Sequence, residues 1–142
     1  MSNWFKFTYC RYLEKDQETG EIYEIYRPTV PLQISYKGKI SFGFQTLVDS
    51  GSDRNLFPAS LGESIGIDIK KGPKRIIRGI GGFTLTAYFH NVKVHIAGYD
   101  FETEVDFSFE HPFPLLGRMG FFRFFKKIEF KEKEQSIEFR IR

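Results

Sequence analysis

Cysteine is nearly absent from this chain of 142 residues, with Cys10 as the single example. No intrachain disulfide can form, which favours a reducing compartment. Histidine is also scarce, and His90, His95 and His111 show neither finger-like nor helical ligand spacing with one another or with Cys10. We therefore expect no metal site and no cofactor.

Long apolar runs are missing as well. No stretch approaches the length of a membrane span, and residues 1–11 mix polar and charged side chains without an apolar signal core. We expect a soluble, cytoplasmic protein that does not engage a membrane. The net charge of +3 is too small to demand a nucleic-acid partner. A β-rich barrel that binds nucleic acid or another partner stays an alternative, and steep salt dependence would support it.

Aromatic residues are abundant, with 17 phenylalanines and 7 tyrosines, and this composition favours strands over helices. The length suits one domain, residues 1–142. Alternating apolar residues predict eight or nine short strands and one or two short helices. The predicted elements include an extra N-terminal hairpin within 1–27, strands over 32–36 and 40–48, a helix over 58–65 and a last hairpin within 128–141, with 131–142 supplying the C-terminal strand.

One aspartate follows an apolar strand at a turn of small residues, Asp49-Ser50-Gly51. A carboxyl group there has an apolar strand behind it and backbone donors around it. Such surroundings can perturb a pKa and support acid–base chemistry. The same tripeptide also occurs in ordinary turns. Because no Gly-x-Ser-x-Gly pattern surrounds the serines, a serine nucleophile is not predicted.

Two further motifs follow in the chain. The glycine-rich stretch Gly79-Ile80-Gly81-Gly82 predicts a mobile hairpin tip that can approach a ligand closely. It is not a dinucleotide fingerprint, because a strand rather than a helix follows. Leu115-Leu116-Gly117-Arg118 ends an apolar strand at a glycine. The alternatives are a plain glycine-rich hairpin and an ordinary buried strand end with a surface arginine.

In this order, the three motifs resemble those of the retropepsin-type aspartic proteases, the single-domain family of retroviral proteases and their bacterial relatives. The resemblance runs from about residue 32 to residue 130. It implies an all-β fold, a closed antiparallel β-barrel-like acid protease fold with one or two short helices, in an obligate homodimer. The implied activity is that of an aspartic endopeptidase, in which water is activated between two Asp49 carboxylates, one from each subunit.

The resemblance also implies roles for the residues around the turn. Asp49 is the general acid and base, Ser50 bonds across the dimer axis, and Gly51 leaves room for substrate and bonds to it. The expected substrate-binding residues are Ser52, Asp53 and Arg54 after the turn, and Arg78, Gly79, Ile80, Gly81 and Gly82 in a flap that closes over an extended peptide.

Three expectations about individual side chains follow from this resemblance. Asp53 should form a partly buried ion pair with Arg118, which follows Gly117, beside the dimer interface. The Ser52 hydroxyl should donate to the Asp49 pair, and Arg54 should favour acidic side chains in the substrate.

Two questions stay open in the sequence. The inter-subunit sheet of this family is expected to come from the 137–141 strand or from the N-terminal hairpin. A catalytically silent peptide-binding or dimerisation module with the same fold is the alternative function.

Overall fold

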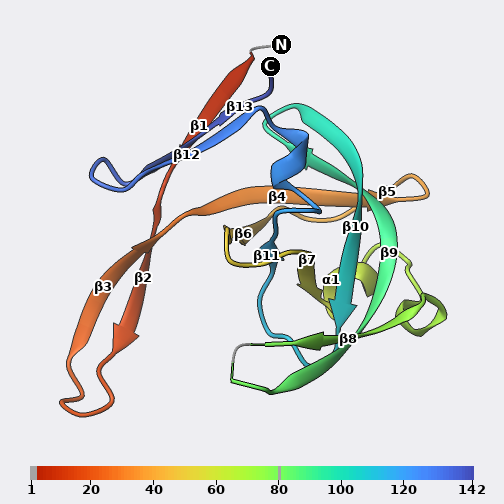
Figure 1. Cartoon of the computed structure of the whole chain (residues 1–142), viewed down its shortest axis with the longest axis horizontal. Helices are drawn as coiled ribbons and strands as arrows, with labels where there is room; N and C mark the ends of the chain where they lie inside the picture. Colours follow the sequence, from red (N-terminus) through yellow and green to blue (C-terminus); the bar gives the residue numbers. More distant parts are fainter. Residues whose placement is uncertain (1–2, 80) are drawn as a thin grey trace.

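A closed barrel forms the centre of the computed structural model, which describes residues 3–79 and 81–142 (Figure 1). Around the barrel the strands are β4 (Thr29–Tyr36), β6 (Phe44–Val48), β11 (Leu115–Leu116), β7 (Asn55–Pro58), β10 (Tyr99–Ser108) and β9 (Thr84–Ile96), and β9 pairs with β4 to close it. The β6–β11 and β7–β10 pairs are parallel, and the other barrel pairs are antiparallel. The predicted closed, mostly antiparallel barrel is confirmed.

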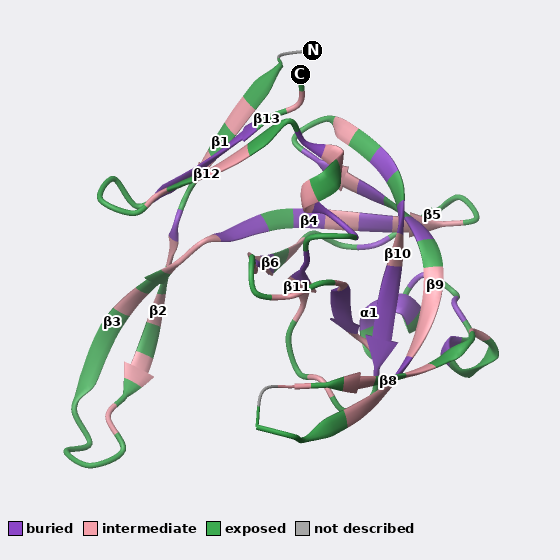
Figure 2. Cartoon of the chain, in the orientation of Figure 1, coloured by how far each residue is buried: buried purple, intermediate pink, exposed green. Residues whose placement is uncertain are grey.

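The barrel interior is filled by the alternating residues that the sequence predicts. In β4, Val30, Leu32 and Ile34 are buried, and Ile34 lies opposite Val94 of β9. Phe107 of β10 is fully buried among them. Because side chains alternate across a strand, this inward set leaves polar residues on the outer face. Figure 2 shows the resulting alternation of buried and less buried positions along β4, whereas the second half of β10 is buried throughout.

Short elements complete the barrel. Helix α1 (Ala59–Glu63) falls within the predicted range, with Pro58 preceding its first turn and Gly66 at φ +87° after its end. The 3₁₀ turns η1 (Ile69–Lys71) and η2 (Phe122–Phe124) are three residues each. Among the described residues, no helix has the length and apolar character needed to cross a membrane.

The strand predicted over 40–48 is divided in two. The short strand β5 (Lys39–Ile40) ends before Ser41, which is buried, and β6 starts at Phe44. The Ser41 hydroxyl accepts a hydrogen bond from the backbone N–H of Ile34 at 3.0 Å and so interrupts the pairing. A two-residue strand such as β5 shows no periodicity, and the described residues hold 13 strands where eight or nine were predicted.

Both chain ends meet in a second sheet. Strand β1 (Trp4–Thr8) pairs with β13 (Ser136–Arg140), which also pairs with β12 (Lys127–Lys131). Phe5 and Phe139 stack at 5.0 Å between ring centroids, and Phe121 and Phe125 contact Phe139 from the barrel side. In this chain the terminal strands therefore pair with each other.

The hairpin of β2 (Cys10–Lys15) and β3 (Ile22–Arg27) extends away from the barrel (Figure 1). It starts at Cys10, because β1 belongs to the terminal sheet. Its turn is closed by the Asp16 carboxylate, which accepts hydrogen bonds from the backbone N–H groups of Glu18 and Thr19, and by Gly20 at φ +74°. We call this hairpin the arm.

Candidate active site

The Asp49 side chain is fixed by backbone groups on both sides. The backbone N–H of Asp49 donates to the carbonyl of Leu116 at 2.9 Å, and the Asp49 carboxylate accepts a hydrogen bond from the backbone N–H of Gly51 at 2.9 Å. Asp49 is half-buried, whereas Ser50 and Gly51 are exposed. The turn thus holds a carboxylate in a defined direction and leaves it accessible from solvent.

The Leu115–Arg118 motif supports this turn directly. Strand β11 lies parallel to β6, with Leu116 opposite Val48, the residue before Asp49. The N–H of Arg118 donates to the carbonyl of Ser52 at 2.8 Å. A Cβ atom at Gly117 would lie 2.4 Å from the carbonyl oxygen of Arg54, so only glycine permits this approach of two backbones.

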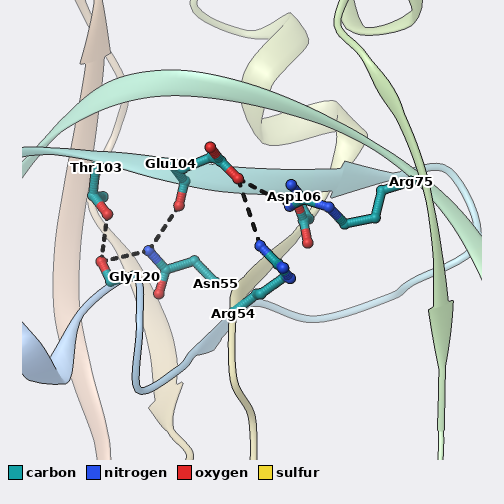
Figure 3. A network of polar contacts seen from close by, with 7 residues as sticks. All are labelled: Arg54, Asn55, Arg75, Thr103, Glu104, Asp106 and Gly120. Carbon is teal, nitrogen blue, oxygen red and sulfur yellow. Dashed lines mark hydrogen bonds and ion pairs between the residues drawn. The ribbon is translucent and has the colours of Figure 1, made fainter.

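A buried amide joins the same segments. Asn55 is fully buried, and its Nδ2 donates to the carbonyl of Gly120 at 2.8 Å and to that of Glu104 at 3.2 Å (Figure 3). Its Oδ1 accepts the N–H of Gly117 at 3.1 Å. Asn55 was not among the predicted site residues, although an asparagine that opens an apolar strand straight after the turn was a usable signal.

The glycine-rich stretch forms the tip of a hairpin between β8 (Lys74–Arg78) and the first half of β9. The N–H of Gly79 donates to the carbonyl of Phe83 at 2.9 Å, and Gly81 and Gly82 have φ values of +97° and +87°. The side chain of Phe83 covers Gly79, where a Cβ atom would lie 2.6 Å from the ring. The predicted Ile80 lies outside the described residues.

A cleft of about 560 Å³ lies between this hairpin and the Asp49 turn. Its walls are mostly apolar, and its charged residues are Asp53 and three arginines. The lining comprises Gly51, Ser52, Asp53, Arg54, Leu56, Arg75, Ile76, Ile77, Arg78, Gly79, Phe83, Leu85, His111 and Leu115. The fold thus gathers most of the predicted binding residues around one cleft. Gly81 and Gly82 lie at the hairpin tip, and Gly117 and Arg118 lie behind the turn.

Two predicted side-chain contacts are not found. The Ser52 hydroxyl donates to the carbonyl of Arg54 at 2.8 Å and not to Asp49, because the turn bends back on itself at that point. Within the part of the chain that the structure describes, Asp53 and Arg118 form no ion pair, and both are exposed. Their segments are joined through the backbone instead, by the Met119 N–H that donates to the carbonyl of Asp53 at 2.8 Å.

At the wall of the cleft, a charge network that includes Arg54 and Arg75 links β8 to β10 (Figure 3). Arg75 Nη1 lies 2.6 Å from Asp106 Oδ1 and 2.9 Å from Glu104 Oε1, and Arg54 lies 3.7 Å from Glu104. Asp106 is only 1% exposed. Burial raises its pKa above the ordinary 3.8, and the positive charge of Arg75 opposes that rise. Arg75 thereby fastens the base of the hairpin to the barrel.

The three histidines make contacts in different parts of the chain. His95 Nδ1 lies 2.9 Å from Asp100, and His90 Nε2 contacts the carbonyl oxygen of Ile69 at 2.8 Å. His111 lines the cleft, and burial lowers its pKa below the ordinary 6.5, which favours the neutral ring. The described residues contain no group of three or more metal-ligating side chains.

Comparisons with known proteins identify the fold. No family model and no curated protein sequence matches the chain. Among solved structures, the EIAV protease complexed with the inhibitor HBY-793 superposes with a TM-score of 0.50 at 22% identity, over 65% of this chain and 82% of that chain. At this identity the likeness concerns the fold alone. The chain has the retropepsin-like fold of that retroviral protease.

Proposed function

We propose that this protein is an aspartic endopeptidase that acts as a homodimer, with one Asp49 from each subunit in a shared active site. The observation that carries the proposal is the accessible Asp49 carboxylate, fixed at the end of β6 beside a cleft under a glycine-tipped hairpin. One chain offers a single aspartate of this kind. A two-fold axis next to the turn would supply the second.

The chemistry follows from the pairing of two carboxylates. Held about 3 Å apart, they cannot both ionise, so one keeps a proton while the other stays charged. The charged carboxylate takes a proton from a bound water, which attacks the scissile carbonyl. The protonated carboxylate donates its proton to the carbonyl oxygen. The site then needs neither a metal nor a covalent intermediate.

The cleft suits an extended peptide with apolar side chains. Leu56, Ile77 and Leu85 supply apolar walls, and the β8–β9 hairpin would close over the chain and exclude water. Strand-like substrate backbone can bond to the exposed edge of such a hairpin. Among the described residues, Arg54 and Arg75 of the lining have acidic partners, and Arg78 has none. Because Arg54, the arginine expected to favour acidic substrate side chains, contacts Glu104, we assign that preference to Arg78 instead.

Cleavage of a mixed peptide library at about pH 4 to 7 tests the proposal. Wild type should cleave and Asp49→Asn should lose at least about a thousandfold in rate, because the amide cannot take a proton from water. Asp68→Asn, an exposed aspartate in another loop, is the matched control and should cleave like wild type.

Two results would contradict the proposal. Equal cleavage by wild type and Asp49→Asn would mean that Asp49 is not the catalyst. No cleavage by either protein, with a dimer confirmed by sedimentation, would instead favour a catalytically silent peptide-binding module.

A further inference from the structure

The arm has little to hold it in place within one chain. Its strands are six residues each, or about 20 Å long. In the described residues, side-chain hydrogen bonds from the arm to the barrel come from Cys10 and Tyr12 at its base, and the longest-range of them joins Cys10 to Gln45. An isolated two-stranded hairpin is marginally stable in water, so an arm of this length requires a surface to pack against.

The two faces of the arm differ. Cross-strand pairs share a face, which places one set of residues toward the barrel and another toward solvent. The inner face comprises Cys10, Tyr12, Glu14, Tyr23, Ile25 and Arg27. The outer face comprises Arg11, Leu13, Lys15, Ile22, Glu24 and Tyr26, all of them exposed. Tyr23, near the free end of the inner face, is 49% exposed.

A groove of about 400 Å³ runs between the inner face and the barrel. From the arm it is lined by Tyr12, Glu14 and Arg27, and from the body by Thr29, Gln45, Leu47, Phe113 and Pro114. Leu47 belongs to β6, the strand that leads to the Asp49 turn, so the groove lies along that strand. Phe113 is 50% exposed at its edge. An apolar groove beside a half-built site marks a surface for a macromolecule.

We infer that the arm clasps a second copy of this chain, with its inner face and the adjoining groove forming part of the dimer interface. The inference rests on the proposed function, because a site with one aspartate per chain is completed only by a second copy. The arm, the turn after β6 and the C-terminal end of β8 all lie on the left in Figure 1, which is the side on which we place that copy.

Charge supports a second copy as the occupant. The charged residues of the inner face are Glu14 and Arg27, which pair with each other at 2.6 Å. The face therefore carries no net charge, and a two-fold axis brings it against a copy of itself without repulsion. Strand β13 pairs with β1 on one side and with β12 on the other, so it has no free edge for an inter-subunit sheet, whereas the arm is free to contact a second copy.

The dimer dissociation constant, measured by sedimentation equilibrium, tests the inference. Tyr23→Ser on the inner face should raise it at least about tenfold, since truncating a buried interface tyrosine commonly has this effect. Leu13→Ser on the outer face is the matched control: it lies one pair along the same hairpin, is 62% exposed, and should change the constant less than about threefold. Equal effects of the two substitutions, or no effect of either, would overturn the inference.

Hydrogen exchange gives a second readout without any substitution. Amide groups of β2 and β3 should gain protection when wild type is concentrated from well below to well above its dissociation constant, whereas β12 should not change. Unchanged exchange in the arm on dimerisation would also overturn the inference.

The dimer dissociation constant and hydrogen exchange can both be measured on Asp49→Asn, so that neither measurement depends on catalysis. If the wild type cleaves peptides as a dimer and Tyr23→Ser does not change its dissociation constant, the inference about the arm is refuted and the proposed function stands. If the dimer depends on Tyr23 but cleaves no peptide, the proposed function is refuted and the inference about the arm stands.

Discussion

Replacing Arg75 by methionine should destabilise the protein strongly, because it leaves the Asp106 carboxylate buried without its counter-charge. Arg75 Nη1 lies 2.6 Å from Asp106 Oδ1, and the second oxygen, Oδ2, is buried without a hydrogen bond. Removing one member of a buried ion pair costs about 3–5 kcal/mol. We expect about 3 kcal/mol, the lower end, since Arg75 is 23% exposed and Asp106 can take up a proton. Methionine keeps the apolar stem, although the contact of the guanidinium with the Phe89 ring is lost.

Arg54→Met provides the matched control. Arg54 contacts the same network through Glu104, but at 3.7 Å and with both side chains about 40% exposed. Ion pairs of this kind contribute less than about 1 kcal/mol. Urea unfolding at pH 7, followed by circular dichroism at one protein concentration, gives both free energies of unfolding. A loss for Arg75→Met within about 1 kcal/mol of that for Arg54→Met would refute the argument that burial of Asp106 sets the cost.

The pH dependence of the same variant provides an independent check. Burial raises the pKa of Asp106 in the folded protein above its unfolded value. The folded state therefore binds the proton more tightly, so the stability contribution of Asp106 is full below the unfolded pKa and is lost as pH rises through the folded pKa. Without Arg75 that pKa rises further. The deficit of Arg75→Met relative to wild type should thus shrink as the pH falls from 7 toward 4, and a deficit that grows would contradict the assignment.

Two further substitutions probe the site. Asn55→Ala should lower the free energy of unfolding by about 2–3 kcal/mol, because it leaves the N–H of Gly117 buried without a partner and removes one of the two hydrogen bonds to the carbonyl of Gly120, which keeps the bond from the Thr103 hydroxyl. Urea unfolding measures this, and a loss below about 1 kcal/mol would contradict it. Arg78→Glu should lower kcat/KM for peptides with acidic side chains by about tenfold and leave apolar peptides within about threefold, as measured with matched peptide pairs. The same loss for both peptide classes would show that Arg78 holds the hairpin and not the substrate charge.

The sequence alone determined the order of the local elements. The alternation of Leu32 and Ile34, the proline before α1, and the glycines at 79, 81 and 82 each act over a few residues, so the barrel strand, the helix and the hairpin tip were all predicted. The placement of Asp49 at the end of an apolar strand followed from the same local pattern.

Only the tertiary structure decided which distant segments meet. Trp4–Thr8 pairs with Ser136–Arg140 rather than with its neighbour in the chain, and Arg75 finds Asp106 about thirty residues on. Periodicity gives the face that a strand buries but not the strand that lies beside it, because long-range pairing depends on how the whole core packs. The Ser52 hydroxyl shows the same limit at short range. Its bond to the Arg54 carbonyl depends on the path of the turn, and the backbone of Gly117, more than sixty residues on, packs against that turn at Arg54.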